Sequence, residues 1–227
     1  MRPIGALLFF LSLIYFLIAY LTTFGEMAEH GSAVRAITWD GVLFTVFALH
    51  HSIFARAGVR DRVAREAPPE LERSIYVCIA SLLFTAVIAM WQPVPGVMWS
   101  ANAAGLWGLR VVQVCGMWLT VRSAAVLDIR DLAGLRPSPV GRALSGSPEF
   151  KTAGPYGWVR HPIYTGWFLF VWAASPMTMT RLVFAAVSCG YLLIAIPFEE
   201  RSMRALPGGR YDRYATSVRW RLIPGLY

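Results

Sequence analysis

The sequence predicts an all-α integral membrane protein with about six transmembrane helices, a C-terminal helical hairpin and an interfacial amphipathic tail helix. Of its 227 residues, 56% are hydrophobic and only 15% are charged, whereas soluble domains carry about 25% charged residues. The apolar residues form solid blocks of the length that crosses a bilayer, about 20 residues. A transmembrane barrel would instead alternate over segments of about 10 residues.

Six apolar blocks account for the predicted helices. The last two are separated by only five residues, so they are expected to pair as an antiparallel hairpin. The fifth block is short, because its 14 residues rise only about 21 Å against a hydrocarbon core of ~30 Å. We expect its inner end to be recessed and to form the floor of a pocket. The blocks are residues 4–23, 37–55, 74–92, 104–127, 162–175 and 181–198.

The distribution of positive charge predicts the orientation. With both termini and the even-numbered loops inside, the inner side carries 17 of the 21 Arg and Lys residues, which agrees with the excess of Lys and Arg in cytoplasmic loops. The expected location is therefore the inner membrane, with both termini cytoplasmic. The net charge of +8 then reports contact with anionic lipid rather than with nucleic acid.

Two regions are expected on this layout. Residues 1–127 form a membrane region of four helices, and residues 128–227 form a cofactor-binding region with a cytoplasmic loop, the hairpin 162–198 and the tail helix. The loop contains turn signals at 137–139 and 146–148. The three cysteines of the chain lie inside apolar blocks without C-x-x-C spacing, so neither a disulfide nor a metal site is predicted.

The most informative stretch is 160–166, which reads Arg-His-Pro-Ile-Tyr-Thr-Gly and opens the fifth block. Proline suits the first position of a helix, so a helix beginning near Pro162 directs its positive end at this cluster. Such an end can hold an anion such as a carboxylate. For Arg160 alone, the alternative to a binding function is anchoring of the chain at the membrane surface.

Two adjacent carboxylates, Glu199 and Glu200, close the sixth block. Adjacent positions on a helix point about 100° apart, so we expect the two to differ in function. One can face a pocket while the other pairs with Arg204, four residues after Glu200. A solvated helix end is the simpler alternative.

The polar tail places Tyr211, Tyr214 and Val218 on one helical face. Two tyrosines on that face can cover an aromatic ring or a sulfonium through cation–π contact; an aromatic belt is the alternative.

In the second block, Asp40 and His51 lie on one stripe of the helix, and a packing or capping function is favoured for them over catalysis.

These motifs resemble the C-terminal signature of isoprenylcysteine carboxyl methyltransferases, which are membrane enzymes that use S-adenosylmethionine. Segments of the N-terminal half are similar to bacterial methanethiol S-methyltransferases, a branch of the same superfamily. The quoted residues are Gly154-Pro155-Tyr156, Val159-Arg160-His161-Pro162-x-Tyr164-x-Gly166, Glu199-Glu200, Tyr211-x-x-Tyr214, Ile223-Pro224, and the segments 50–56, 72–77 and 91–99.

The resemblance implies a site for S-adenosylmethionine, in which His161 and Tyr164 contact the amino-acid end of the cofactor and Gly166 permits close approach. One departure is the proline in segment 206–210, which is expected to shorten or break the preceding helix. The residues implied as catalytic are Arg160, Glu199 and Glu200, and those implied for cofactor binding are Tyr156, His161, Pro162, Tyr164, Gly166, Tyr211 and Tyr214.

The expected activity is methyl transfer to a small or apolar acceptor, without a metal. The leading acceptor is a methanethiol-like thiol, and the alternative is the carboxylate of a prenylcysteine or another isoprenoid. An NADPH-dependent oxidoreductase similar to sterol reductases and a non-enzymatic membrane protein are the rivals from other classes. The residues leave open the acceptor, the general base and the oligomeric state.

Overall fold

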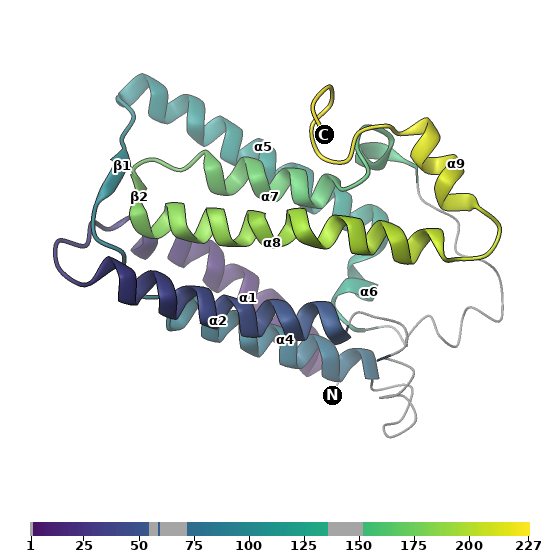
Figure 1. The fold of residues 1–227 in the computed structure, drawn as a ribbon, viewed down its shortest axis with the longest axis horizontal. Helices are drawn as coiled ribbons and strands as arrows, with labels where there is room; N and C mark the ends of the chain where they lie inside the picture. The colour runs from purple at the N-terminus through teal and green to yellow at the C-terminus, as the bar shows by residue number, and fades with distance from the viewer. Residues whose placement is uncertain (1, 55–58, 60–71, 136–151) are drawn as a thin grey trace. The chain divides into compact units, whose positions relative to one another are not determined.

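The computed structural model describes residues 2–54, 59, 72–135 and 152–227, and this part of the chain is largely helical (Figure 1). One two-stranded sheet, β1 with β2, accompanies the helices in these residues. The elements are α1 (Arg2–Leu21), η1 (Thr23–Gly25), α2 (Ala33–Phe54), α4 (Glu72–Ala89), β1 (Val97–Trp99), α5 (Ala103–Leu127), α6 (Ile129–Leu132), η3 (Gly154–Gly157), α7 (Pro162–Trp172), β2 (Met177–Thr178), α8 (Met179–Arg204) and α9 (Arg210–Ser217).

All six predicted blocks contain a helix, which confirms the all-α membrane class. Within the described residues, five helices are long and apolar enough to cross a membrane: α1, α2, α4, α5 and α8. The sixth, α7, has 11 residues and rises about 16 Å at ~1.5 Å per residue. It ends before the predicted limit, at Trp172, where the backbone N–H of the capping residue Ala173 donates to the carbonyl oxygen of Leu169. The turns expected at 137–139 and 146–148 lie outside the described residues.

The chain forms two compact units. The first comprises Met1–Met98, Ile129–Ser147 and Met177–Val183, and the second comprises Trp99–Asp128, Pro148–Pro176 and Phe184–Tyr227. Helix α8 contributes residues to both units. The division into regions 1–127 and 128–227 remains a prediction.

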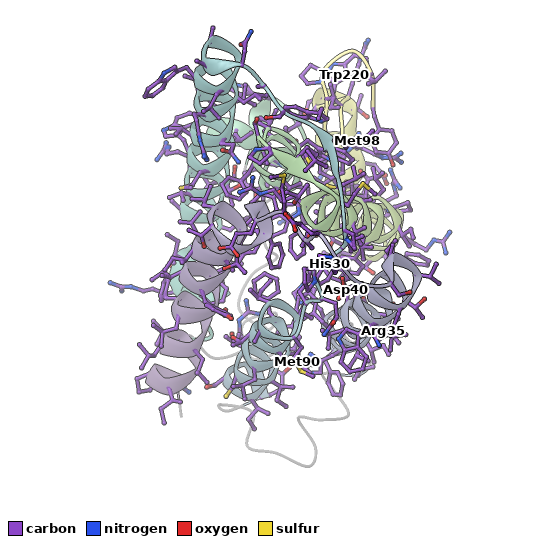
Figure 2. All side chains as sticks on the ribbon, turned by 90° about the vertical axis from the view of Figure 1, so that its left-hand side faces the viewer. His30, Arg35, Asp40, Met90, Met98 and Trp220 are labelled. Atoms are coloured by element: carbon purple, nitrogen blue, oxygen red, sulfur yellow. The ribbon has the colours of Figure 1, made fainter. Side chains whose placement is uncertain are left out.

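In the first unit, α1 and α2 both pack against α4. The carboxylate of Asp40 on α2, labelled in Figure 2, accepts a hydrogen bond from the backbone N–H of Gln92 at 2.8 Å, just beyond α4. The ring of His51 meets the hydroxyl of Tyr76 at 3.0 Å between Nδ1 and Oη. Asp40 and His51 therefore serve the packing and capping functions that were favoured for them.

Arg181 completes the end of α1 in the same unit. Its side chain is 2% exposed, and its guanidinium donates to the carbonyl oxygen of Tyr20 at 2.8 Å and to that of Leu21 at 3.0 Å. The last carbonyls of a helix have no partner within the helix. Arg181 supplies those partners from the start of α8, so one cation joins two distant segments of the chain.

Replacing Arg181 with methionine is expected to lower the free energy of unfolding by about 3 kcal/mol, because buried carbonyls then lose their donors. For a chain of this size the midpoint of thermal unfolding in detergent should fall by roughly 6–12 °C. Arg35→Met, which removes the same charge from an exposed position of α2, is the control. Equal shifts for the two variants would contradict the capping assignment.

In the second unit, α5 and α7 pack closely. A Cβ atom built on Gly116 would lie 2.6 Å from the carbonyl oxygen of Gly166, and one built on Gly166 would lie 2.5 Å from that of Gly116. The two backbones therefore touch because both positions are glycine. The amide of Gln113 on α5 adds a hydrogen bond to the carbonyl oxygen of Phe170 at 3.2 Å.

Helices α7 and α8 form the predicted antiparallel hairpin. The indole N–H of Trp167 donates to the hydroxyl of Ser188 at 3.1 Å, and the hydroxyl of Tyr164 donates to the carboxylate of Glu199. Later residues of α8 thus meet earlier residues of α7. This arrangement brings the start of α7 and the end of α8 to the same place, where the predicted site residues gather.

Candidate active site

The turn before α7 is shaped by glycine and proline. The short helix η3 is closed by a hydrogen bond from the N–H of Trp158 to the carbonyl oxygen of Pro155 at 3.1 Å. The chain then reaches His161, the N-cap of α7, with Pro162 in the first turn. The predicted helix start is therefore confirmed, and the positive end of α7 lies at the His161 side of the helix.

A cavity of about 350 Å³ lies at this end of the hairpin, a size that is typical of small-molecule sites. Seven of the ten predicted site residues line it. The other three, Pro162, Gly166 and Glu200, are not among its lining residues, and Gly166 packs against α5 instead. The lining residues are Leu127, Tyr156, Arg160, His161, Ile163, Tyr164, Glu199, Met203, Tyr211 and Tyr214.

The two adjacent carboxylates differ as expected. Glu199 lines the cavity, and its side chain is 43% exposed. One of its oxygens accepts the hydrogen bond from Tyr164, and Oε2 lies 3.7 Å from Nδ1 of His161. Glu199 therefore presents a negative charge to the cavity.

Glu200 is fully buried and lies among cations. Its Oε1 lies 2.8 Å from Nε of Arg160 and 3.4 Å from Nε2 of His161. Its Oε2 lies 3.4 Å from Nη2 of Arg204 and 3.2 Å from Nη2 of Arg221. The predicted pair with Arg204 is confirmed, and a buried carboxylate with several cationic partners keeps its charge at a tolerable cost.

Arg160 connects the turn before α7 to the tail. Besides its bond to Glu200, its Nη1 donates to the carbonyl oxygens of Val218 at 3.2 Å and of Arg219 at 3.0 Å. These carbonyls lie just beyond the end of α9. Nε of Arg160 is therefore engaged by Glu200 on α8, and Nη1 is engaged by the tail.

Helix α9 contributes two tyrosines to the cavity wall. Tyr211 and Tyr214 are buried, with their rings edge to face at 5.9 Å between centroids, and they cluster with Val218. The hydroxyl of Tyr214 donates to the carbonyl oxygen of Tyr156 at 2.9 Å. Burial raises the pKa of Tyr214 to about 12 and raises that of Tyr211 as well, so both phenols are neutral at pH 7.

The departure in segment 206–210 decides how α9 is placed. Helix α8 ends at Arg204, as the proline at 207 predicted. Gly208 and Gly209 then adopt φ values of 92° and 57°, a region that glycine enters without steric cost. The chain can therefore turn back, so that the tyrosine face of α9 closes over the cavity.

His161 is neutral at pH 7. Burial lowers its pKa from 6.5 to about 4; Glu200 opposes this shift, whereas the charges of Arg160 and Arg221 add to it. Its ring stacks on that of Tyr164, with 5.4 Å between centroids and 11° between planes. The imidazole is thus a fixed and uncharged part of the cavity wall.

Comparison with known proteins decides the family. Residues 144–205 match the isoprenylcysteine carboxyl methyltransferase (ICMT) family. Methanethiol S-methyltransferase 2 of Bradyrhizobium diazoefficiens is 34% identical, over 85% of this chain and 75% of the relative. The methanethiol S-methyltransferase of Mycobacterium tuberculosis is 36% identical, over 81% of this chain and 77% of the relative. That of Crocosphaera subtropica is 35% identical, over 82% and 74%.

The chain belongs to the methanethiol S-methyltransferase branch of the ICMT family. It is therefore a membrane methyltransferase, and the resemblance of its motifs is confirmed. The oxidoreductase and non-enzymatic alternatives are not favoured by these relatives. No solved structure matches the chain.

The cavity of this methyltransferase includes residues that sequence reasoning missed. Leu127 ends α5, Ile163 lies in the first turn of α7, and Met203 lies near the end of α8. Met203 follows Glu199 by four residues and so lies on the same helical face; this spacing was a usable signal. Leu127 had none, because its place depends on the packing of α5 against α7.

The stability of the methyltransferase is expected to fall as the pH drops from 7 to 4. Unfolded His161 binds a proton near pH 6.5, whereas folded His161 binds it only near pH 4, so acid favours the unfolded chain by about 3 kcal/mol in total. Thermal unfolding between pH 7 and 4.5 measures the slope, which His161→Gln should reduce. Identical slopes for the two proteins would contradict the pKa assignment.

Proposed function

We propose that this methyltransferase transfers the methyl group of S-adenosylmethionine to the sulfur of a small thiol such as methanethiol. The observation that carries the proposal is the cavity at the start of α7, where a carboxylate, a neutral imidazole and several tyrosines face one space. The names of the relatives support a thiol acceptor. The absence of a metal requirement remains a prediction.

The residues fit a positively charged sulfur donor. Glu199 offers a partly exposed carboxylate, and Tyr211 and Tyr214 offer aromatic faces, which attract a cation. The positive end of α7 suits a carboxylate. When bound, S-adenosylmethionine would supply a methyl group on its sulfonium sulfur; the thiolate sulfur would bond to this methyl carbon as the old sulfur–methyl bond breaks, which releases S-adenosylhomocysteine. Arg160, His161, Tyr164 and Glu199 are the residues that we propose to hold it.

The chain's own residues prepare the acceptor. A thiolate rather than a thiol is the nucleophile, so the thiol must lose a proton. We propose that Glu199 takes it, because this carboxylate lines the cavity and its side chain is partly exposed. The apolar side chains of Leu127, Ile163 and Met203 suit a small apolar thiol and exclude water, and the tyrosine wall closes over it.

The location that fits this chemistry is the inner membrane, with the cavity and both termini on the cytoplasmic side. The charge distribution supports it, because the inner loops and the two termini together carry 17 of the 21 Arg and Lys residues. S-adenosylmethionine is a soluble, charged molecule, so its site needs an opening to the cytosol. Two reporters fused after Tyr227 test this orientation. A reporter that works only in the cytosol should be active, and a reporter that works only outside the cytosol should be inactive.

Purified full-length protein in lipid nanodiscs tests the reaction. With S-adenosylmethionine carrying a labelled methyl group and methanethiol, labelled dimethyl sulfide is expected in the headspace. A prenylcysteine offered in parallel examines the carboxylate alternative, for which a labelled methyl ester is the signature. Transfer to neither acceptor, together with no binding of S-adenosylhomocysteine, would reject the proposed function.

A further inference from the structure

The last residues of the chain form a closed loop. The backbone N–H groups of Arg221, Leu222 and Ile223 all donate to the carbonyl oxygen of Tyr227, at 2.9, 3.0 and 3.2 Å. The guanidinium of Arg221 also lies over the ring of Tyr227, 5.1 Å from its centroid. This C-terminal loop, residues 218–227, follows directly on α9, and Trp220 marks it in Figure 2.

The backbone of the C-terminal loop is joined to the start of α7. The N–H of Arg160 donates to the carbonyl oxygen of Trp220, and that of His161 donates to the carbonyl oxygen of Arg221, both at 2.9 Å. The hydroxyl of Thr165 donates to the carbonyl oxygen of Leu222 at 2.8 Å. The loop therefore pairs with the segment that carries two cavity residues.

One side chain ties the C-terminal loop to α8. Arg221 approaches Oε2 of Glu200 with two nitrogens, Nη2 at 3.2 Å and Nε at 3.3 Å. Such a two-nitrogen contact fixes orientation as well as distance. Glu200 has no exposed surface, whereas Arg221 is 30% exposed. Because Glu200 also contacts Arg160 and His161, the position of Arg221 bears on the cavity wall.

We propose that Arg221 is a positioning residue of the methyltransferase, which sets the affinity for the methyl donor by holding α9 and the His161 turn together through Glu200. This inference rests on the proposed function. Arg221 is not a lining residue of the cavity, so it acts through its neighbours. Its loss leaves Glu200 with Arg160 and Arg204, so the carboxylate stays paired and the fold is expected to persist.

A comparison of two arginine variants tests the proposal. Arg221→Met removes the contact to Glu200, whereas Arg219→Met removes the same charge two residues earlier, from an exposed position. We expect Arg221→Met to weaken binding of S-adenosylhomocysteine about 10- to 100-fold, because losing a hydrogen bond between charged groups costs affinity of that order. Arg219→Met should stay within about twofold of wild type. Calorimetry on the full chain in nanodiscs measures both, and kcat at saturating donor should change less than the dissociation constant.

A lysine at the same position separates charge from geometry. Arg221→Lys keeps the charge but cannot offer the planar two-nitrogen contact, so we expect donor affinity between those of wild type and Arg221→Met. Should Arg221→Met fail to fold, the lysine variant decides alone. Wild-type affinity in Arg221→Lys would then overturn the proposal, and so would equal affinities for Arg221→Met and Arg219→Met.

The titration of His161 reports whether Arg221 and Glu200 lie near the imidazole in the folded enzyme. The charge of Arg221 lowers the pKa of His161 and that of Glu200 raises it. Arg221→Met should therefore raise the pKa of His161, and Glu200→Gln should lower it, as followed by the imidazole resonances. Unchanged titration in both variants would overturn the proposal, because Arg221 and Glu200 would then not lie beside the His161 turn. Failure of the proposed function would look different, because wild-type protein would then bind no S-adenosylhomocysteine.

Discussion

Replacing Glu199 with glutamine is expected to lower kcat/KM for methyl transfer about 100-fold. The substitution keeps the shape of the side chain and an oxygen that can accept the hydrogen bond from Tyr164. It removes the negative charge that faces the cavity, so both the attraction for a sulfonium and the acceptor for the thiol proton are lost. Initial rates over both substrate concentrations, with binding of S-adenosylhomocysteine alongside, measure the effect.

Asp212→Asn is the matched control for the loss of a carboxylate. Asp212 lies on α9 with its side chain 62% exposed, 3.3 Å from Nε of Arg204, and exposed ion pairs of this kind contribute little. Its kcat/KM should stay within about twofold of wild type. A Glu199→Gln protein as active as Asp212→Asn would remove Glu199 from the chemistry.

Replacing Gly166 with alanine is expected to cost about 3 kcal/mol or more of the free energy of unfolding. The added Cβ would lie 2.5 Å from the carbonyl oxygen of Gly116 and 2.8 Å from the backbone nitrogen of Thr120. Both are backbone atoms of α5, which cannot turn aside as a flexible side chain would, so the helices must separate. A lowered yield and a lower unfolding midpoint in detergent are the measurements.

Gly190→Ala is the control, because a Cβ at that position of α8 has no atom within 4 Å. Its stability should be unchanged or higher, since alanine favours a helix over glycine by about 1 kcal/mol. The pair also tests the binding function that the family resemblance implies for Gly166. A Gly166→Ala protein with a wild-type unfolding midpoint but weakened donor binding would favour direct contact with the donor over packing.

The fold was predictable because hydropathy reports directly which segments avoid water. Each of the six predicted blocks contains a helix, and α8 ends at Arg204, ahead of the proline at 207 that was expected to shorten or break it. The length of α7 was overestimated, because apolar composition continues through 173–175 while the backbone already leaves the helix ahead of Pro176. Hydropathy measures burial, but helix ends depend on local backbone geometry.

The site was predictable where its residues share a local pattern. The stretch 160–166 and the pair Glu199-Glu200 carry short-range signals, and the difference between the two carboxylates followed from helical geometry. Arg221 lies 21 residues beyond Glu200. No short-range sequence pattern joins two residues so far apart, so the sequence did not indicate their contact. The resemblance implied that some group approaches Gly166 closely, but it did not identify that group. In the structure, the group is the backbone of α5.

The short arm of the hairpin has a consequence for how α7 is kept in place. A helix of 11 residues rises about 16 Å, roughly half of a hydrocarbon core of ~30 Å, so α7 cannot cross a bilayer by itself. The polar groups of its backbone ends must be covered by protein rather than by lipid. Gln113 of α5 covers the carbonyl oxygen of Phe170 near one end, so α7 owes to its neighbours the position that a longer helix gains from its own length.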